Sequence, residues 1–144
     1  MSEPNYEEGN RLAMFPPVQP LKPRVLIVDD NVDAADSLYI LLSFTGYEAR
    51  VAHCGSEAVE LCRGFHADVA LINLGFPDTV DLQLAALLRR QLGQDALFVA
   101  VTGWADEASR NRARDAGFAH CLVKPLDFDS LETLLRVPGP LPFE

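Results

Sequence analysis

The stretch RVLIVDD, residues 24–30, decides how the rest of the chain is interpreted. Its central apolar residues are mostly β-branched, and they are followed directly by two carboxylates. An uninterrupted apolar run of this kind is typical of a strand that is buried on both faces of a parallel sheet. Acids placed directly after such a strand lie at its carboxyl end, where open α/β sheets bind their ligands. The stretch therefore predicts a sheet type and the edge of the sheet at which a site belongs.

Similar apolar runs recur along the chain and alternate with helical patterns. Strands are predicted at 24–30, 47–52, 68–73, 96–103 and 119–125, and helices at 33–46, 55–64, 81–93, 106–117 and 127–136. Apolar strands that alternate with amphipathic helices indicate a (βα)5 α/β fold, with a doubly wound parallel sheet covered by helices on both faces.

The helical segments also predict which side chains face the core. Apolar or small residues at a spacing of about 3.6 define one inward stripe on each of three helices. Ser56 and Asp127 precede or begin two further helices and are predicted to cap them. The predicted inward residues are Ala35, Leu38, Leu42, Thr45, Leu84, Leu87, Leu88, Ala108, Ala113 and Ala116.

Composition limits the class of protein. A chain of 144 residues is long enough for one domain, and its net charge of −9 argues against binding to nucleic acid. No apolar run is long enough to span a membrane and no secretory signal precedes the first strand, so we expect a cytoplasmic protein with reduced cysteines. The proline-rich segments 1–23 and 137–144 are predicted to be flexible tails on either side of a domain at 24–136.

Polar residues follow each of the strong strands at the same predicted edge. Asp29 and Asp30 end the strand predicted at 24–30, and Asn73 ends the strand at 68–73. Thr102 lies at the end of the strand at 96–103, and Lys124 at the end of the strand at 119–125. Carboxylate oxygens are ligands that Mg²⁺ prefers, and a lysine and a hydroxyl can hold the oxygens of a phosphoryl group. The set therefore indicates phosphoryl chemistry with a divalent metal.

Residues 24–136 resemble the receiver domain of two-component response regulators. The resemblance rests on four motifs taken together: VLIVDDN, the strand-end residue before LGFPD, VTGW and LVKP. The most similar receivers are those attached to hybrid sensor kinases, a bacterial class of signalling protein. They have near equivalents of the stretches VLIVDDNVDAADSL, VAHCGSEA and AGFAHCLVKP. The resemblance implies a flavodoxin-like fold with strand order 2-1-3-4-5 and a role in a phosphorelay rather than as an enzyme.

The resemblance also implies a role for each position. Asp29, Asp30 and the backbone carbonyl of Gly75 match the family's Mg²⁺ ligands. Thr102 matches its switch hydroxyl, and Lys124 matches its phosphoryl-contacting lysine. The proline that follows, Pro125, matches one whose peptide bond is usually cis.

The sequence departs from the family pattern in three places. Asn73 stands where the phosphoacceptor aspartate belongs, and an amide is not a nucleophile that could form an acyl phosphate. Val80 and Asp81 stand where the family has Asp-Gly, and Cys121 replaces its switch aromatic residue. Mg²⁺ binding is expected to be possible but weak, because one carboxylate of the usual set is missing. Asp78 or Asp81 could be a displaced acceptor, although each lies away from the expected strand end.

Two main interpretations follow. The first is a pseudo-receiver that binds a histidine kinase, a phosphotransfer protein or an output protein without being phosphorylated, and that could form a homodimer. Its expected partner surface includes Trp104, Arg110, Arg114 and Cys121. The alternative is an ordinary phosphorylatable receiver with an engineered change at position 73. A dehalogenase-type phosphatase is disfavoured by Asn31, and a flavodoxin by the acidic loop at 29–36.

Overall fold

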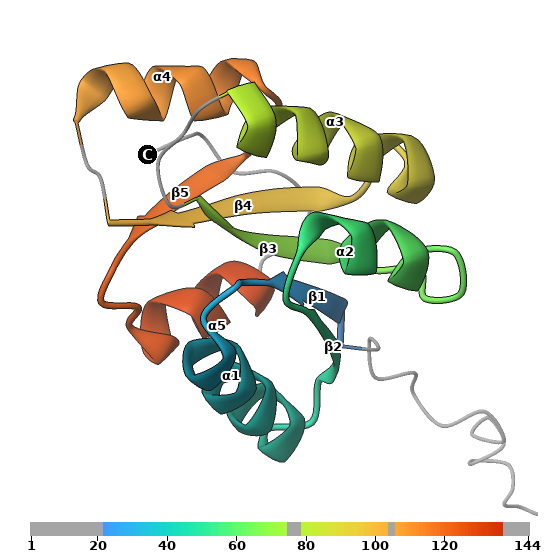
Figure 1. Ribbon diagram of the computed structural model, residues 1–144. Helices are drawn as coiled ribbons and strands as arrows, with labels where there is room; N and C mark the ends of the chain where they lie inside the picture. Colours follow the sequence, from blue (N-terminus) through green and yellow to red (C-terminus); the bar gives the residue numbers. More distant parts are fainter. Residues whose placement is uncertain (1–21, 75–78, 104–105, 137–144) are drawn as a thin grey trace, which may run out of the picture.

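The computed structural model describes residues 22–74, 79–103 and 106–136, and within these ranges strands and helices alternate (Figure 1). The strands are β1 (Arg24–Val28), β2 (Glu48–Ala52), β3 (Val69–Leu74), β4 (Leu97–Thr102) and β5 (His120–Val123). The helices are α1 (Val32–Phe44), α2 (Gly55–Leu61), α3 (Thr79–Leu92), α4 (Glu107–Asp115) and α5 (Phe128–Arg136).

The strands form one parallel sheet in the order β2-β1-β3-β4-β5, as predicted. Val28 at the end of β1 is in register with Ala52 on one side and with Ile72 on the other. Thr102 at the end of β4 is in register with Leu74 and Val123. The carboxyl ends of the strands therefore lie along one edge of the sheet.

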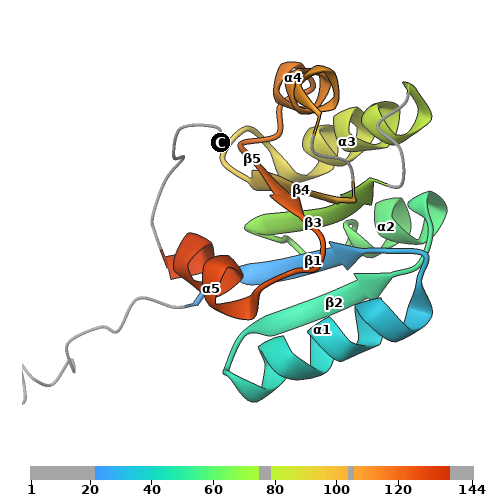
Figure 2. The same cartoon turned by 90° about the vertical axis from the view of Figure 1, so that its left-hand side faces the viewer.

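Helices cover both faces of this sheet (Figure 2). On one face, α1 and α5 pack over a core cluster that contains Ile27, Leu71 and Leu131. On the other, α2, α3 and α4 cover a second cluster that contains Leu26, Ile72 and further buried residues. Successive residues of β1 and β3 point to opposite faces, and both faces are buried, which explains why these strands are apolar throughout.

Two helices present a face that differs from the predicted one. Leu87 is 48% exposed, because the buried stripe of α3 passes through Ala85, Leu88 and Leu92. In α4, Ala108 is exposed and Ser109 is buried instead. The sequence pattern missed Ser109 because its hydroxyl is polar.

Hydrogen bonds at two helix starts bear on the predicted caps. Cys54, not Ser56, is the N-cap of α2, and no side chain caps that helix. At the start of α5, Asp127 accepts hydrogen bonds from the Asp129 N–H and from the Ser130 hydroxyl, at 3.3 and 2.8 Å, so its predicted role is confirmed. The hydrogen bond from Ser130 is also the main cause of a lowered pKa of the Asp127 carboxyl.

The predicted tails lie outside the described residues except at Lys22 and Pro23. Lys22 was assigned to the tail, but its ammonium donates to the Thr45 carbonyl oxygen at 2.5 Å and lies 4.8 Å from the centre of the Tyr47 ring. The three cysteines are free, as predicted. Among the helices of the described ranges, none has the length and apolar character that crossing a membrane would need.

Candidate functional site

The loop after β1 places Asp29 by local hydrogen bonds. The Asp29 N–H donates to the Ala52 carbonyl oxygen at 3.0 Å, which extends the β1–β2 pairing by one residue. Its carboxylate accepts from the Asn31 N–H at 2.9 Å, and the Asn31 side chain in turn caps α1 by accepting from the Ala34 N–H at 3.1 Å. Asp29 is therefore held at the edge of the sheet by the turn that starts α1.

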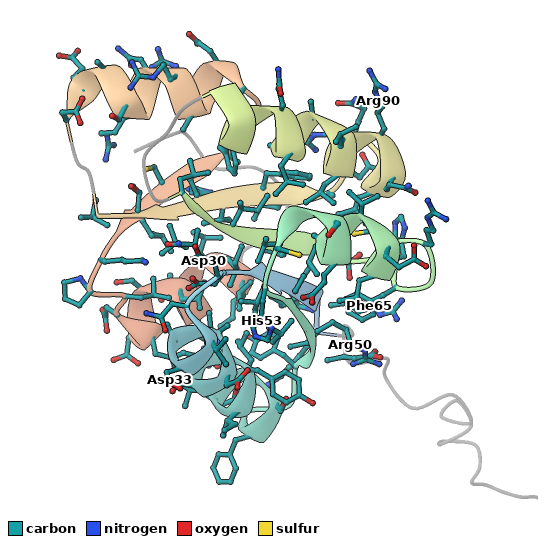
Figure 3. The ribbon with its side chains drawn as sticks, in the orientation of Figure 1. Asp30, Asp33, Arg50, His53, Phe65 and Arg90 are labelled. Carbon is teal, nitrogen blue, oxygen red and sulfur yellow. The ribbon has the colours of Figure 1, made fainter. Side chains whose placement is uncertain are left out.

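Asp30 lies in the same turn but is exposed, at the end of the sheet away from Phe65 and Arg50 (Figure 3). Unlike Asp29, it is not part of the pocket described below. The two acids are thus neighbours in the chain that differ in their surroundings.

Asn73 is the fifth residue of β3 and pairs in register with Val101 of β4. The residue is half-buried, and its side-chain oxygen Oδ1 is inaccessible and has no hydrogen-bond partner among the described residues. A buried acceptor without a partner lowers stability unless a ligand, an ion or water completes it. The Asn73 oxygen is therefore available to accept a hydrogen bond or to contact a cation.

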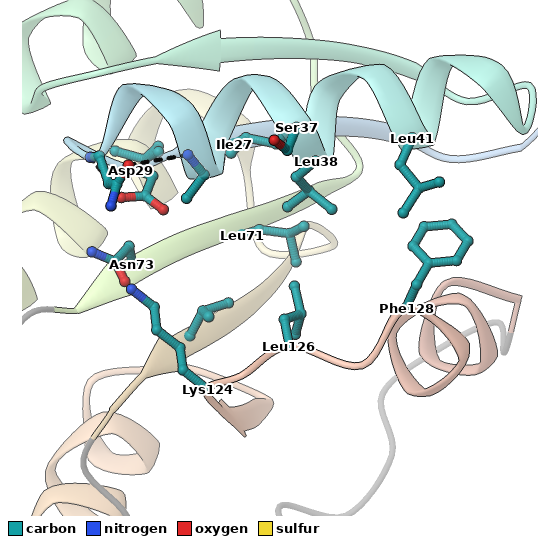
Figure 4. A pocket seen from close by; sticks show the side chains of 14 residues that line it. Ile27, Asp29, Ser37, Leu38, Leu41, Leu71, Asn73, Lys124, Leu126 and Phe128 are labelled. Carbon is teal, nitrogen blue, oxygen red and sulfur yellow. Dashed lines mark hydrogen bonds between the residues drawn. The ribbon is translucent and has the colours of Figure 1, made fainter.

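Lys124 reaches the same place from β5. Its N–H donates to the Thr102 carbonyl oxygen at 2.8 Å, which joins the ends of β4 and β5. The following Lys124–Pro125 peptide bond is cis, as the resemblance implied. Figure 4 shows the Asn73 and Lys124 side chains pointing toward one another, with Asp29 beside them. Thr102 is buried at 1% exposure and does not line this pocket.

These polar groups form one end of a pocket of about 390 Å³. From this end the pocket continues between α1 and the segment that leads into α5 (Figure 4). Its remaining walls are mainly apolar, and they include Leu38, Leu41, Leu71, Leu126 and Phe128. We refer to this space, from Asn73 to Phe128, as the α1–α5 groove.

The sequence predicted the polar end of the groove but not its apolar part. The missed signal lies in the first helix, where apolar residues occur outside the predicted inward stripe. Ile40 and Phe44 are 64% and 88% exposed, and Leu41 is 39% exposed at the groove. A helix that is apolar around most of its circumference has more apolar surface than one core can cover.

The expected partner surface is only partly exposed. Arg114 is exposed and lies 3.8 Å from the Asp115 carboxylate, and Arg110 is half-buried. Cys121 is 7% exposed and packs in the core beneath α3 and α4, where burial raises the pKa of its thiol. Cys121 therefore offers little to a partner. Trp104 and the metal-ligand position Gly75 lie outside the described residues, as does Asp78.

Metal binding can be judged from the available oxygen atoms. Among the residues that the structure describes, no three His, Cys, Asp or Glu side chains are grouped so as to hold a metal ion. Asp29 and Asp30 supply carboxylates, and the unpartnered Asn73 Oδ1 is a neutral oxygen that could join them. Mg²⁺ accepts such oxygens and keeps several waters, so the set suits weak rather than tight binding.

Comparisons with known proteins agree with this geometry. The model of the response regulator receiver domain family matches residues 25–136. The response regulator MprA of Mycobacterium ulcerans is 31% identical over 113 residues, which cover 78% of this chain and 48% of that protein. The chain therefore spans about half the length of the curated relatives that it matches.

Solved structures share this fold. A response regulator from Burkholderia pseudomallei, determined with a phosphorylated aspartic acid, a calcium ion and citrate, is 30% identical with a TM-score of 0.71, covering 80% of this chain and 67% of that one. A CheY-like receiver domain from Methylobacillus flagellatus is 31% identical with a TM-score of 0.66, covering 80% and 97%.

Proposed function

This chain belongs to the response regulator receiver domain family of two-component systems, and from that premise we propose that it is a pseudo-receiver, a binding module that takes no phosphoryl group at position 73. It then acts through contacts with other proteins and not as an enzyme.

One observation supports this proposal above the others. Asn73 lies at the strand end that faces Lys124 and Asp29, which is where the family's acceptor carboxylate is expected. An uncharged amide cannot attack a phosphohistidine or acetyl phosphate to form an acyl phosphate, because its nitrogen lone pair is delocalised into the carbonyl group. The neighbouring groups can hold a phosphoryl group, but the nucleophile is missing.

The remaining groups of the site would still have recognisable roles. Asp29 and Asp30 would hold Mg²⁺, which supplies neutralisation of charge on phosphoryl oxygens when it is bound. Lys124 would contact an anionic oxygen, and Thr102 would be the switch hydroxyl. With Asn73 in place of an acid, the formal charge of Asp29, Asp30 and Lys124 is −1 rather than −2, so the attraction for a cation is smaller.

We further propose that the partner is a histidine kinase, a phosphotransfer protein or an output protein that binds the surface formed by α4, β5 and α5. Arg110 and Arg114 supply positive charge there on a chain of net charge −9. A homodimer through the same surface would be isologous. The hybrid-kinase subtype, the cytoplasmic location and the position of Trp104 on this surface remain predictions.

The experiment is intact-mass measurement after incubation with acetyl phosphate and Mg²⁺, for the unaltered chain and for Asn73→Asp. We expect phosphorylation of the variant alone, because the substitution supplies the carboxylate while Asp29, Thr102 and Lys124 are retained. Asn73→Glu is the matched control, since it adds the same charge with a side chain one methylene too long for the position.

Each other outcome is informative. A phosphorylated unaltered chain would refute the proposal and direct attention to Asp78 or Asp81. Failure to phosphorylate Asn73→Asp, with its fold confirmed by circular dichroism, would mean that the rest of the site no longer supports phosphoryl transfer. In the metal-free state Asn73→Asp should lower the free energy of unfolding by about 1 kcal/mol, because it adds a carboxylate beside Asp29, and Mg²⁺ should reverse this loss.

A further inference from the structure

The α1–α5 groove combines a polar end and an apolar body in one cavity, which is the usual composition of a small-molecule site. Its volume of about 390 Å³ falls within the range of roughly 300–1,000 Å³ typical of such sites. The volume therefore suits a small ligand.

The polar end specifies the kind of ligand head group. Asn73 Oδ1 is a buried acceptor without a partner among the described residues, so it requires a donor. The exposed Lys124 ammonium is a donor, and its side chain points toward Asn73 (Figure 4). A hydroxyl or a carboxamide is both donor and acceptor, and so it could satisfy the two groups together.

The charges at this end disfavour an ionic head group. Asp29 and Lys124 both line the groove, and their formal charges cancel. Without a bound metal ion, an anionic head would be repelled by Asp29 and by the nearby Asp30, and a cationic head would lose hydration beside the apolar walls and be repelled by Lys124. An uncharged head meets neither penalty.

The apolar walls specify the rest of the ligand. Leu38 and Leu41 come from α1, Leu71 from β3, and Leu126 and Phe128 from the segment entering α5. In Figure 4 these side chains follow one another along the groove, on the side away from Asn73 and Lys124. An apolar chain or ring attached to the head group would lie along them and would be removed from water.

We propose that the α1–α5 groove binds an uncharged amphipathic small molecule, with its hydroxyl or carboxamide head between Asn73 and Lys124 and its apolar body against Leu71, Leu126 and Phe128. This inference goes beyond the proposed function, because the groove can hold such a ligand whether or not the protein accepts phosphate. It would give this receiver a chemical input at the position where its relatives have the acceptor.

The test uses ¹⁵N-labelled full-length protein and 1-octanol as the probe, followed by chemical-shift changes in NMR spectra. We expect saturable changes at the Leu38, Leu71 and Leu126 amides and at the Asn73 side-chain amide. Octanoate and octylammonium should bind several-fold more weakly because of their charge. 1-Butanol should bind at least about tenfold more weakly because it buries fewer methylenes.

Matched variants locate the binding site. Leu41→Trp places a large side chain at the groove and should abolish the changes. Ile40→Trp adds the same side chain at the adjacent position, which is 64% exposed and does not line the groove, and it should bind 1-octanol like the unaltered chain. Asn73→Leu should weaken binding about tenfold by removing the acceptor while keeping the apolar walls.

Several results would overturn the proposal. One is the absence of saturable changes at groove residues, and another is equal binding by Leu41→Trp and Ile40→Trp. Concentration-dependent shifts at the groove without octanol would show that a second copy occupies it. Displacement of signals from residues 1–21 by octanol would show that this segment is the occupant. None of these readouts depends on phosphorylation, so they separate this inference from the proposed function.

Discussion

The two faces of the sheet are covered by helices in different ways. On the α2–α4 face, α2 packs against α3, and Arg89 joins the end of α3 to the loop before β4 and the loop before β5. On the α1–α5 face, the two helices are separated near the carboxyl edge by the groove. Away from this edge the α1–α5 face is closed as well, because Leu42 of α1 and Leu131 of α5 belong to one buried cluster.

The contrast is clearest at Arg89. Its guanidinium donates to the Ala96 and Gly117 carbonyl oxygens at 2.7 and 2.9 Å, and lies 4.1 Å from the centre of the Phe98 ring. Burial lowers the pKa of Arg89. Gly117 has φ +102°, a conformation that favours glycine at this point of the loop. The α2–α4 face is therefore built for stability, whereas the α1–α5 face leaves apolar surface available for binding.

The largest expected effect tests this difference with one aromatic residue from each face. Phe98 is 1% exposed, so Phe98→Ala should lower the free energy of unfolding by about 3–5 kcal/mol. Phe128 is half-buried at the groove, and Phe128→Ala should cost only about 1 kcal/mol. Urea unfolding of both variants measures the two values. Equal losses would mean that the groove is as much a part of the core as the closed face.

The sequence could predict the sheet because the periodicity of its strands depends on burial alone. β1 and β3 are apolar at successive positions, as expected for strands of a parallel sheet that helices cover on both faces. The inward faces of α3 and α4 were harder to predict. Leu87 and Ala108 are apolar yet exposed, because a helix carries more apolar residues than its contact with the sheet can cover.

The candidate site was predictable where it depends on strand ends. Asp29, Asn73 and Lys124 meet because parallel strands bring their carboxyl ends to one edge. The apolar part of the groove was not predictable, because it depends on the distance between α1 and α5, which no local pattern encodes. The burial of Cys121 was missed for a similar reason, since it follows from the packing of α3 and α4 over β5.

An intermediate effect is expected from two neighbouring arginines of α3. Arg89→Ala removes the donors to four backbone carbonyls, of which those of Ala96 and Gly117 accept the shortest hydrogen bonds, and it removes the cation from the Phe98 ring. It should therefore cost about 2–3 kcal/mol. Arg90→Ala changes an exposed side chain and should stay within about 0.5 kcal/mol of the unaltered chain. Arg89→Lys should restore little, since one ammonium cannot donate to both the Ala96 and the Gly117 carbonyls as the planar guanidinium does. Urea unfolding again provides the measurement, and equal losses for Ala at 89 and 90 would contradict the role given to Arg89.

The smallest expected effect compares the caps of one helix from each face. α4 begins at Asp106, whose carboxylate accepts from the Ser109 N–H at 3.1 Å and from the Ser109 hydroxyl at 2.9 Å. α1 begins at Asn31, whose neutral oxygen accepts one N–H at the same distance of 3.1 Å. The hydrogen bonds from Ser109 lower the pKa of Asp106 below its ordinary value of 3.8. The cap of α4 should therefore depend on pH through its own charge, and the cap of α1 should not.

The sign of this dependence follows from the direction of the pKa shift. Because the folded state lowers the pKa of Asp106, the charged carboxylate stabilises the fold fully above the unfolded-state value of 3.8, and this contribution is lost as the pH falls below it. Asp106→Asn keeps a good N-cap without a charge. The unaltered chain should accordingly be slightly more stable than Asp106→Asn at neutral pH, and the difference should shrink as the pH falls below 3.8 and through the lowered pKa of Asp106. Other carboxylates cancel in this difference, since both proteins contain them. Unfolding free energies across this pH range measure it, and a difference that stays constant or grows as the pH falls would show that the charge of Asp106 does not stabilise α4.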